Sequence, residues 1–78
     1  MRSRAVLYSR VGCHLCDDAR DVLTGVCGEA GIDFEEIDID GDPDLRARYG
    51  DEIPVVTVDD AIVGFWRIDP ERVRKALA

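Results

Sequence analysis

The pattern of apolar and polar residues divides the first third of the chain into a strand and a long amphipathic helix. Residues 4–8 form a short, mostly apolar run rich in strand formers, which predicts a buried strand. From Leu15 onward, apolar residues recur at helical spacing with charged residues between them, and Gly28 follows as a predicted stop. The apolar positions of this predicted helix are Leu15, Ala19, Val22, Leu23 and Val26.

The middle of the chain predicts a second strand and a short helix. Residues 32–39 alternate apolar and polar side chains, but the phase slips at 35–36. One face of a sheet therefore cannot bury both halves, and we expect a strand with an irregularity. The dipeptide Asp42-Pro43 then offers an N-cap and a first helical residue, and Gly50 offers a C-terminal cap, so a short helix is expected between them.

The last third of the chain predicts a hairpin and a final helix. Two runs of strand formers, 55–58 and 61–63, flank the two aspartates at 59–60, which suits a tight turn although the more diagnostic glycine is missing. Asp69-Pro70 offers an N-cap followed by a proline, as Asp42-Pro43 does, and the apolar residues after it have helical spacing. A final helix is therefore expected.

The order of predicted elements is strand, helix, strand, helix, strand, strand, helix. Two strands separated by a helix nearly always form a right-handed parallel unit, and a final hairpin adds antiparallel strands to the same sheet. We therefore expect an α/β protein with a four-stranded mixed sheet and three helices, in the βαβαββα order of the thioredoxin fold. A chain of 78 residues allows one domain, residues 1–78.

Composition narrows the range of partners and locations. Ten basic residues against 17 acidic ones give a formal charge of −7, which repels nucleic-acid phosphates and anionic membranes, so neither partner is expected. Residues 1–4 are basic, but the apolar run behind them is shorter than a secretory signal, and no segment approaches the length of a membrane span. We expect a cytoplasmic monomer.

The candidate chemistry lies where the first strand passes into the first helix. Cys13 and Cys16 form a CxxC pair in this position, and the context of strand, CxxC and helix favours redox use over metal binding. Unpaired amides and the dipole at a helix N-terminus stabilise a thiolate, which makes Cys13 the expected nucleophile. Cys16, one turn further in, is expected to be more buried and to resolve the mixed disulfide.

Arg10, His14 and Cys27 are further candidates for a functional role. Arg10 would add a favourable charge beside the thiolate. His14 either tunes the cysteine pair by its charge near neutral pH or is simply an exposed loop residue. Cys27 lies eleven residues after Cys16, ~16 Å away on a continuous helix, so the three cysteines cannot share one metal site within a monomer. We expect Cys27 to be a passive core residue, and the functional alternative is intermolecular pairing.

Two further groups of side chains have plain structural expectations. Adjacent residues of a strand point to opposite faces, so one of Phe65 and Trp66 is expected in the core and the other at the surface. The acidic run 35–44 is expected to be a solvated edge.

The chain resembles the glutaredoxin-like branch of the thioredoxin superfamily, over essentially its whole length. The matching segments are 8–19 (YSRVGCHLCDDA), 37–40 (IDID) and 53–55 (IPV). The resemblance implies the same roles for Cys13 and Cys16 as nucleophile and resolving cysteine. It also implies that Arg10, three positions before the nucleophile, helps to bind glutathione.

The resemblance implies three more site residues. Pro54 matches a cis-proline that faces the active site, and Ile53 matches the residue whose backbone binds the thiol substrate. Gly64 matches part of a Gly-Gly-x-Asp segment, but Phe65, Trp66 and Arg67 follow it here. We therefore expect glutathione to be a weak or secondary partner, and another low-molecular-weight thiol or a reductase of the thioredoxin-reductase type to supply electrons. Asp69 is expected to cap a helix rather than take the missing role.

The sequence thus predicts a dithiol reductase that acts on disulfides of proteins or small molecules, without a resident metal or cofactor. Two alternatives stay open at this point. One is a module that binds an iron–sulfur cluster or another metal between two subunits, and the other is an interaction domain with an incidental CxxC.

Overall fold

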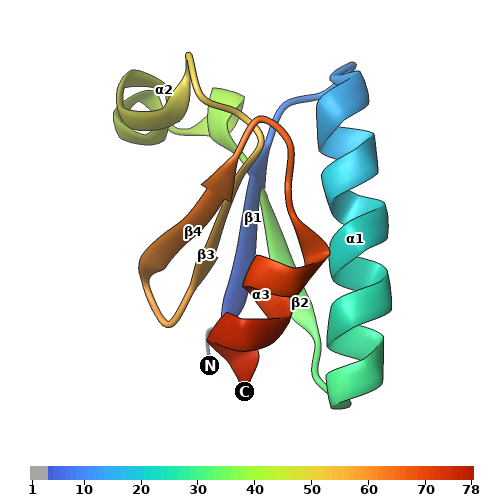
Figure 1. Cartoon of the computed structure of the whole chain (residues 1–78). Helices are drawn as coiled ribbons and strands as arrows, with labels where there is room; N and C mark the ends of the chain where they lie inside the picture. Colours follow the sequence, from blue (N-terminus) through green and yellow to red (C-terminus); the bar gives the residue numbers. More distant parts are fainter. Residues whose placement is uncertain (1–3) are drawn as a thin grey trace.

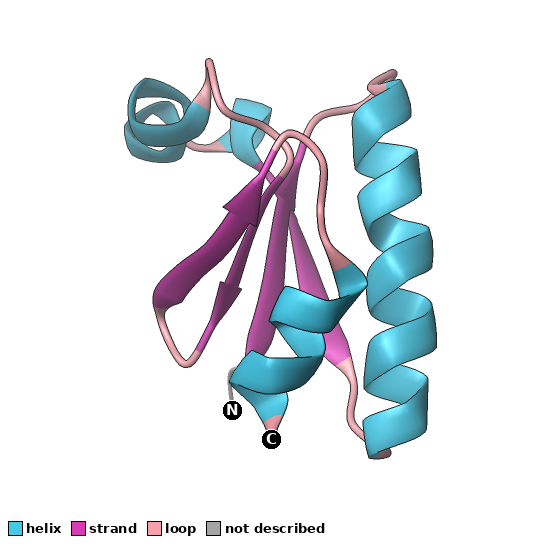
Figure 2. Cartoon of the chain, viewed as in Figure 1, coloured by secondary structure: helices cyan, strands magenta, loops and turns pink. Residues whose placement is uncertain are grey.

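The computed structural model describes residues 4–78, so the first part of the basic start, residues 1–3, lies outside the described residues. The elements in chain order are β1 (Ala5–Ser9), α1 (His14–Ala30), β2 (Phe34–Asp38), a 3-10 turn η1 (Ile39–Gly41), α2 (Pro43–Tyr49), β3 (Val55–Val58), β4 (Ala61–Phe65) and α3 (Pro70–Leu77) (Figures 1 and 2). The βαβαββα order of the thioredoxin fold is confirmed.

The sheet is four-stranded and mixed, with the strand order β2-β1-β3-β4. β1 and β2 are parallel, and β3 is antiparallel to both β1 and β4. β2 pairs with β1 residue for residue, from Phe34 beside Ala5 to Asp38 beside Ser9. The prediction of an irregular strand at 35–36 is therefore wrong. The register shift lies instead between β3 and β4, at Val56 and Thr57.

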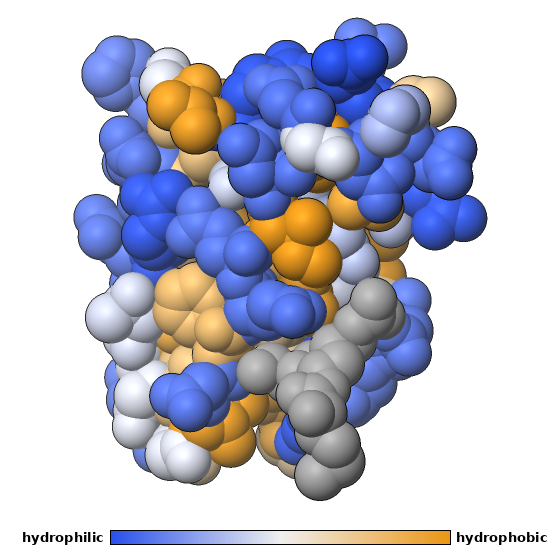
Figure 3. All heavy atoms as spheres, turned by 180° about the vertical axis from the view of Figure 1, so that it is seen from behind, coloured by the Kyte–Doolittle hydropathy of each residue, from blue (hydrophilic) through white to orange (hydrophobic). Residues whose placement is uncertain are grey.

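The alternation of apolar and polar residues slips at 35–36 because the sheet is covered on both faces. α1 and α3 cover one face, and η1 and α2 lie on the other (Figure 1). Phe34 packs against the core under α1 and α3, whereas Ile37 and Ile39 belong to the smaller core under α2. The surface over α2 is mainly hydrophilic in the view from behind (Figure 3), as the sequence of this short helix indicates.

The larger core lies between β1, β3, α1 and α3, and it fixes the helix that carries the cysteines. Its fully buried members include Leu7, Leu23, Val56 and Val73. The predicted helix stop at Gly28 is wrong, because α1 continues to Ala30. The chain leaves the helix at Gly31, whose left-handed φ of 70° suits glycine and whose N–H donates to the carbonyl oxygens of Cys27 and Gly28.

The predicted turns and caps of the second half are confirmed. Asp59 and Asp60 adopt φ values of 52° and 69°, the positive values that a tight type I′ hairpin requires, and aspartate tolerates this conformation. Asp69 caps α3 by accepting a hydrogen bond from the N–H of Glu71 at 2.9 Å. Within residues 4–78, no helix is both long and apolar enough to cross a membrane.

Candidate redox-active site

The two cysteines are placed by the junction between β1 and α1. β1 is completely buried up to Ser9, so the loop that follows starts from a fixed point at the sheet end. Gly12 has a φ of 80°, a left-handed conformation that lets the loop turn into the helix. Cys13 then takes the N-cap position with an extended backbone, and α1 begins at His14.

Cys13 caps the helix with its own sulfur. The backbone N–H of Cys16 donates a hydrogen bond to Cys13 Sγ at 3.2 Å, in the position where a serine or aspartate usually accepts. Cys13 is partly exposed, whereas Cys16 is completely buried. The expected difference in burial between the two cysteines is confirmed, and the partly exposed sulfur is the one at the N-terminus of α1.

Cys16 is held in its protonated form. Burial raises the pKa of this thiol to about 11, and the neighbouring Cys13 adds to the rise. The backbone N–H of Arg10 and the guanidinium of Arg20 act in the opposite direction and limit the rise. The buried Cys16 thiol is thus a poor nucleophile until its proton is removed.

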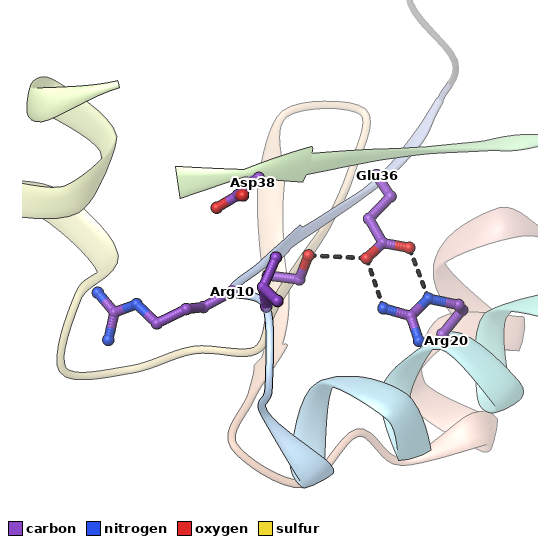
Figure 4. A pocket seen from close by; sticks show the side chains of 6 residues that line it. Arg10, Arg20, Glu36 and Asp38 are labelled. Atoms are coloured by element: carbon purple, nitrogen blue, oxygen red, sulfur yellow. Dashed lines mark hydrogen bonds and ion pairs between the residues drawn. The ribbon is translucent and has the colours of Figure 1, made fainter. Parts of the chain in front are cut away.

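Arg10 points toward η1 and α2 rather than along α1 (Figure 4). Its Nε donates to both carboxylate oxygens of Asp40 at 3.1 Å. Its terminal nitrogen lies near Gly50, at the end of α2. The guanidinium is therefore engaged in an ion pair, and the role expected for Arg10 beside the thiolate or glutathione stays a prediction.

A polar network connects α1 to the sheet beside the cysteines. Arg20 donates to the two carboxylate oxygens of Glu36 at 2.7 and 2.6 Å, and also to Asp17 at 2.8 Å. The hydroxyl of Ser9 donates to Glu36 at 2.8 Å (Figure 4). Arg20 lowers the pKa of the Glu36 carboxyl, whose side chain is 31% exposed. Glu36 therefore binds both the end of β1 and the helix that carries Cys16.

Sequence reasoning missed this network. The acidic run 35–44 is exposed over most of its length, as expected, but Glu36 and Asp40 are also paired with arginines, and Asp38 and Asp42 accept hydrogen bonds from backbone amides. One signal was available, since Arg20 stands four residues after Cys16 and therefore lies on the same side of the helix.

The remaining predicted site residues lie at the same end of the sheet. His14 is exposed and is the first residue of α1 rather than a loop residue. The Ile53-Pro54 bond is cis, as predicted, and Pro54 is fully buried. Because Val55 pairs with Tyr8, Pro54 lies beside the end of β1, where the cysteine loop begins.

Gly64 and the aromatic residues after it differ from expectation. Gly64 lies within β4 beside Val56, and a side chain there would meet Ile68 at 3.4 Å. Phe65 and Trp66 are both exposed, at 46% and 53%, so the expectation that one is buried is wrong. Strand alternation stops applying because β4 ends at Phe65 and Trp66 has a left-handed φ of 61°.

Cys27 has no place in this site. It is buried in the larger core, near the far end of α1, as predicted. Burial raises the pKa of its thiol, and the carboxylate of Asp33 adds to the rise. This thiol is therefore a core side chain.

Solved structures of similar chains share this architecture. A protein from X. campestris, XcR50, is 36% identical, with a TM-score of 0.76 over 94% of this chain and 93% of that one. Protein Ne2328 from Nitrosomonas europaea is 29% identical, with a TM-score of 0.83 over 100% of this chain and 94% of that one.

Sequence comparison assigns the family. The uncharacterized protein Rv0508 of Mycobacterium tuberculosis is 35% identical over 82 residues, which cover 99% of this chain and 84% of the relative. The family model described as "Glutaredoxin-like domain (DUF836)" matches residues 4–78, and thus includes the cysteine loop, the cis-proline and all four strands. The chain therefore belongs to the glutaredoxin-like domain family, within the thioredoxin superfamily.

Proposed function

We propose that this protein is a thiol–disulfide oxidoreductase that reduces disulfides through Cys13 and Cys16. The observation that carries the proposal is the 3.2 Å hydrogen bond from the Cys16 amide to Cys13 Sγ at the start of α1. A hydrogen bond to an ionised acceptor is roughly twice as strong as one between neutral groups, so this contact favours the Cys13 thiolate. The dipole of a helix of 17 residues acts in the same direction.

The reaction proceeds in two exchange steps. The Cys13 thiolate attacks one sulfur of the substrate disulfide, forms a mixed disulfide and releases the other substrate sulfur as a thiolate. Cys16 then loses its proton to solvent and attacks Cys13 Sγ, which releases the second substrate thiolate and leaves a Cys13-Cys16 disulfide. Two electrons pass from the cysteine pair to the substrate, and an external thiol or reductase must return them.

The burial of Cys16 supports its role in the second step. A solvent-exposed second thiolate would compete with Cys13 for the substrate, whereas a fully buried thiol with a pKa of about 11 does not. Once the mixed disulfide has formed, the spacing of three residues on one helical turn keeps Cys16 beside its target. The order of the two cysteines follows from this difference in access.

The proposed setting is the reducing cytoplasm, where thiols stay reduced and the protein takes part in redox homeostasis as a monomer. Electrons come from a low-molecular-weight thiol or a reductase of the thioredoxin-reductase type, and no resident cofactor is required. Glutathione is a secondary donor. This assignment is supported by the engagement of Arg10 with Asp40, and by Phe65 and Arg67 where glutaredoxins have a second glycine and an aspartate.

Trapping of the mixed disulfide tests the proposal. Cys16→Ser and Cys13→Ser variants, each with Cys27→Ser to remove background labelling, are incubated with bis(2-hydroxyethyl) disulfide and analysed by intact mass spectrometry. We expect a stable mercaptoethanol adduct on Cys13 in the Cys16→Ser variant, because its resolving thiol is missing. We expect no adduct in the Cys13→Ser variant, since Cys16 is buried.

The Cys27→Ser protein with both active-site cysteines is the matched control. It should oxidise to a Cys13-Cys16 disulfide without retaining an adduct. Equal trapping on Cys16 in the Cys13→Ser variant would refute the assigned order, and the absence of exchange in all three proteins would refute the redox function itself.

A further inference from the structure

An open groove lies beside the cysteine pair and has no part in the two exchange steps. It measures about 450 Å³ and is lined by Leu15, Phe65, Trp66 and Arg67. Leu15 stands directly between the two cysteines in the sequence, whereas the other three residues form the end of β4 and the loop toward α3. The groove thus borders the CxxC segment at Leu15, and two exposed aromatic rings form much of its lining.

The aromatic residues of the groove are exposed but held in place. Trp66 Nε1 donates to the carbonyl oxygen of Asp51 at 3.0 Å, and its backbone N–H donates to the carbonyl oxygen of Pro54 at 2.9 Å. The ring of Phe65 meets the indole edge to face at 5.2 Å. Both rings therefore offer apolar surface to a partner with little loss of conformational freedom on binding.

The backbone at Trp66 has a conformation that is strained for a large side chain. Its φ of 61° lies in the left-handed region, which bulky side chains rarely adopt, and glycine would adopt it without strain. Strained residues of this kind cluster at binding sites, because the strain fixes a side chain where a partner needs it. Here it turns the indole out of the strand and into the groove.

The charge at the groove is the reverse of the charge of the protein. Arg67 lines the groove, is exposed, and has no hydrogen-bond or ion-pair partner within residues 4–78. The chain as a whole has a formal charge of −7, and other arginines near the site are paired with carboxylates. A guanidinium that has no partner among the described residues and lies beside two aromatic rings suits an acidic side chain next to an apolar one.

We propose that the groove of Leu15, Phe65, Trp66 and Arg67 binds the polypeptide chain around a substrate disulfide, and selects an apolar, preferably aromatic, residue and an acidic residue beside the reacting half-cystine. This inference rests on the proposed thiol–disulfide exchange at Cys13 and names its substrate class. A polypeptide fits better than a small disulfide, because sites for small ligands enclose most of the ligand and three of the four residues here are exposed.

Peptide disulfides of defined sequence test this specificity. The parent substrate is a symmetric disulfide of a short peptide with Phe before and Glu after its cysteine. Two related substrates replace Phe with Gly, or Glu with Lys. Reduced protein is mixed with each peptide without any donor, and the second-order rate of formation of the Cys13-Cys16 disulfide is measured by quenched mass spectrometry. We expect the parent peptide to react about tenfold faster than either relative.

Two variants connect the preference to the groove. Trp66→Gly removes the indole at a position whose backbone suits glycine, and should abolish the preference for Phe over Gly. Arg67→Glu should reverse the preference for Glu over Lys. Ile62→Ala and Arg72→Glu are the matched controls, because both residues are exposed and lie outside the groove, and both variants should keep the preferences of the unmodified protein.

The outcomes separate this inference from the proposed function. Equal rates for the three peptides, or preferences unchanged in Trp66→Gly and Arg67→Glu, would overturn the groove assignment while leaving thiol–disulfide exchange intact. If Trp66→Gly does not fold, Phe65→Ala removes the second ring and must weaken the same preference. Failure to reduce both the peptides and bis(2-hydroxyethyl) disulfide would overturn the redox function and the substrate assignment together.

Discussion

The two ends of α1 each carry a buried cysteine, but only the N-terminal end surrounds its cysteine with groups that support chemistry. Cys16 has the Cys13 sulfur, the backbone amide of Arg10 and the guanidinium of Arg20 within electrostatic reach. Cys27 has apolar core neighbours and the carboxylate of Asp33, which opposes ionisation. Burial raises the pKa of both thiols and so disfavours reaction at both. The difference between the two cysteines therefore lies in the groups around each sulfur.

The largest difference in activity should come from replacing one cysteine by alanine at each end of α1. Cys13→Ala removes the nucleophile and should lower the rate of disulfide reduction by ~1,000-fold or more. Cys27→Ala should leave that rate within about twofold and lower the free energy of unfolding by about 1 to 2 kcal/mol, because it opens a small cavity in the core. Steady-state kinetics and urea denaturation measure the two effects, and a large loss of activity in Cys27→Ala would remove the distinction between the ends.

The pH dependence of the second exchange step should reveal the Cys16 thiol. Burial is the main cause of its raised pKa and persists in the mixed disulfide, so the thiolate fraction, and with it the rate of resolution, should rise about tenfold per pH unit through the neutral range. Stopped-flow measurement of the decay of the mixed disulfide between pH 6 and pH 9 tests this. A plateau at neutral pH would show that Cys16 ionises far more easily than its burial predicts.

The same thiol links folding to pH. The pKa of Cys16 is raised from its ordinary value of 9.0 to about 11 in the folded protein. Below pH 9.0 both states largely keep the proton and the stabilising contribution is present. As the pH rises toward 11, the unfolded state loses its proton first, so stability falls. The Cys16→Ala variant should show a smaller fall in urea-denaturation midpoint over this range.

A smaller effect on the rate of resolution is expected when an arginine beside α1 is replaced by glutamine, with one such arginine at each end of the helix. Arg20→Gln leaves the carboxylates of Asp17 and Glu36 uncompensated near Cys16, and should slow resolution up to about fivefold. Arg74, on α3, pairs with Glu29 at the other end of α1 at 3.1 Å and with Glu71, so Arg74→Gln is the matched control and should leave the rate unchanged. Equal rates in the two variants would mean that the Arg20 network does not act on Cys16.

The smallest effect concerns the way in which α1 ends. Gly31→Ala places a side chain at a φ of 70° and should lower the free energy of unfolding by ~1 kcal/mol, with no change in the rate of disulfide reduction. Thermal denaturation together with the activity assay checks both parts. A loss of activity would show that the two ends of the helix are coupled.

The fold and the position of the cysteine pair could be predicted from sequence because local rules and the global arrangement agree. Strand formers before Cys13 and helical spacing after Leu15 define the junction, and the residue types at Asp59 and Asp60 fit the positive φ values of the turn. The cis bond before Pro54 came from the resemblance to the glutaredoxin-like family, since no local pattern distinguishes a cis from a trans proline.

The errors arose where tertiary structure overrides a local rule. Gly28 lies inside α1 because Cys27 before it is still buried against the sheet, and this packing outweighs the poor helix propensity of glycine. Alternation failed at Trp66 because the backbone leaves the strand there. The contact of Arg20 with Glu36 joins residues 16 positions apart, and no periodicity of a single element predicts such a pair.

Trp66 also gives the protein an intrinsic optical probe. It is the single tryptophan of the chain, so all indole emission comes from one known place. The indole is 53% exposed and lines the groove that contains Leu15, so an occupant of the groove would desolvate it and shift its emission to shorter wavelength. Substrate capture can therefore be followed in the unmodified protein without an attached dye.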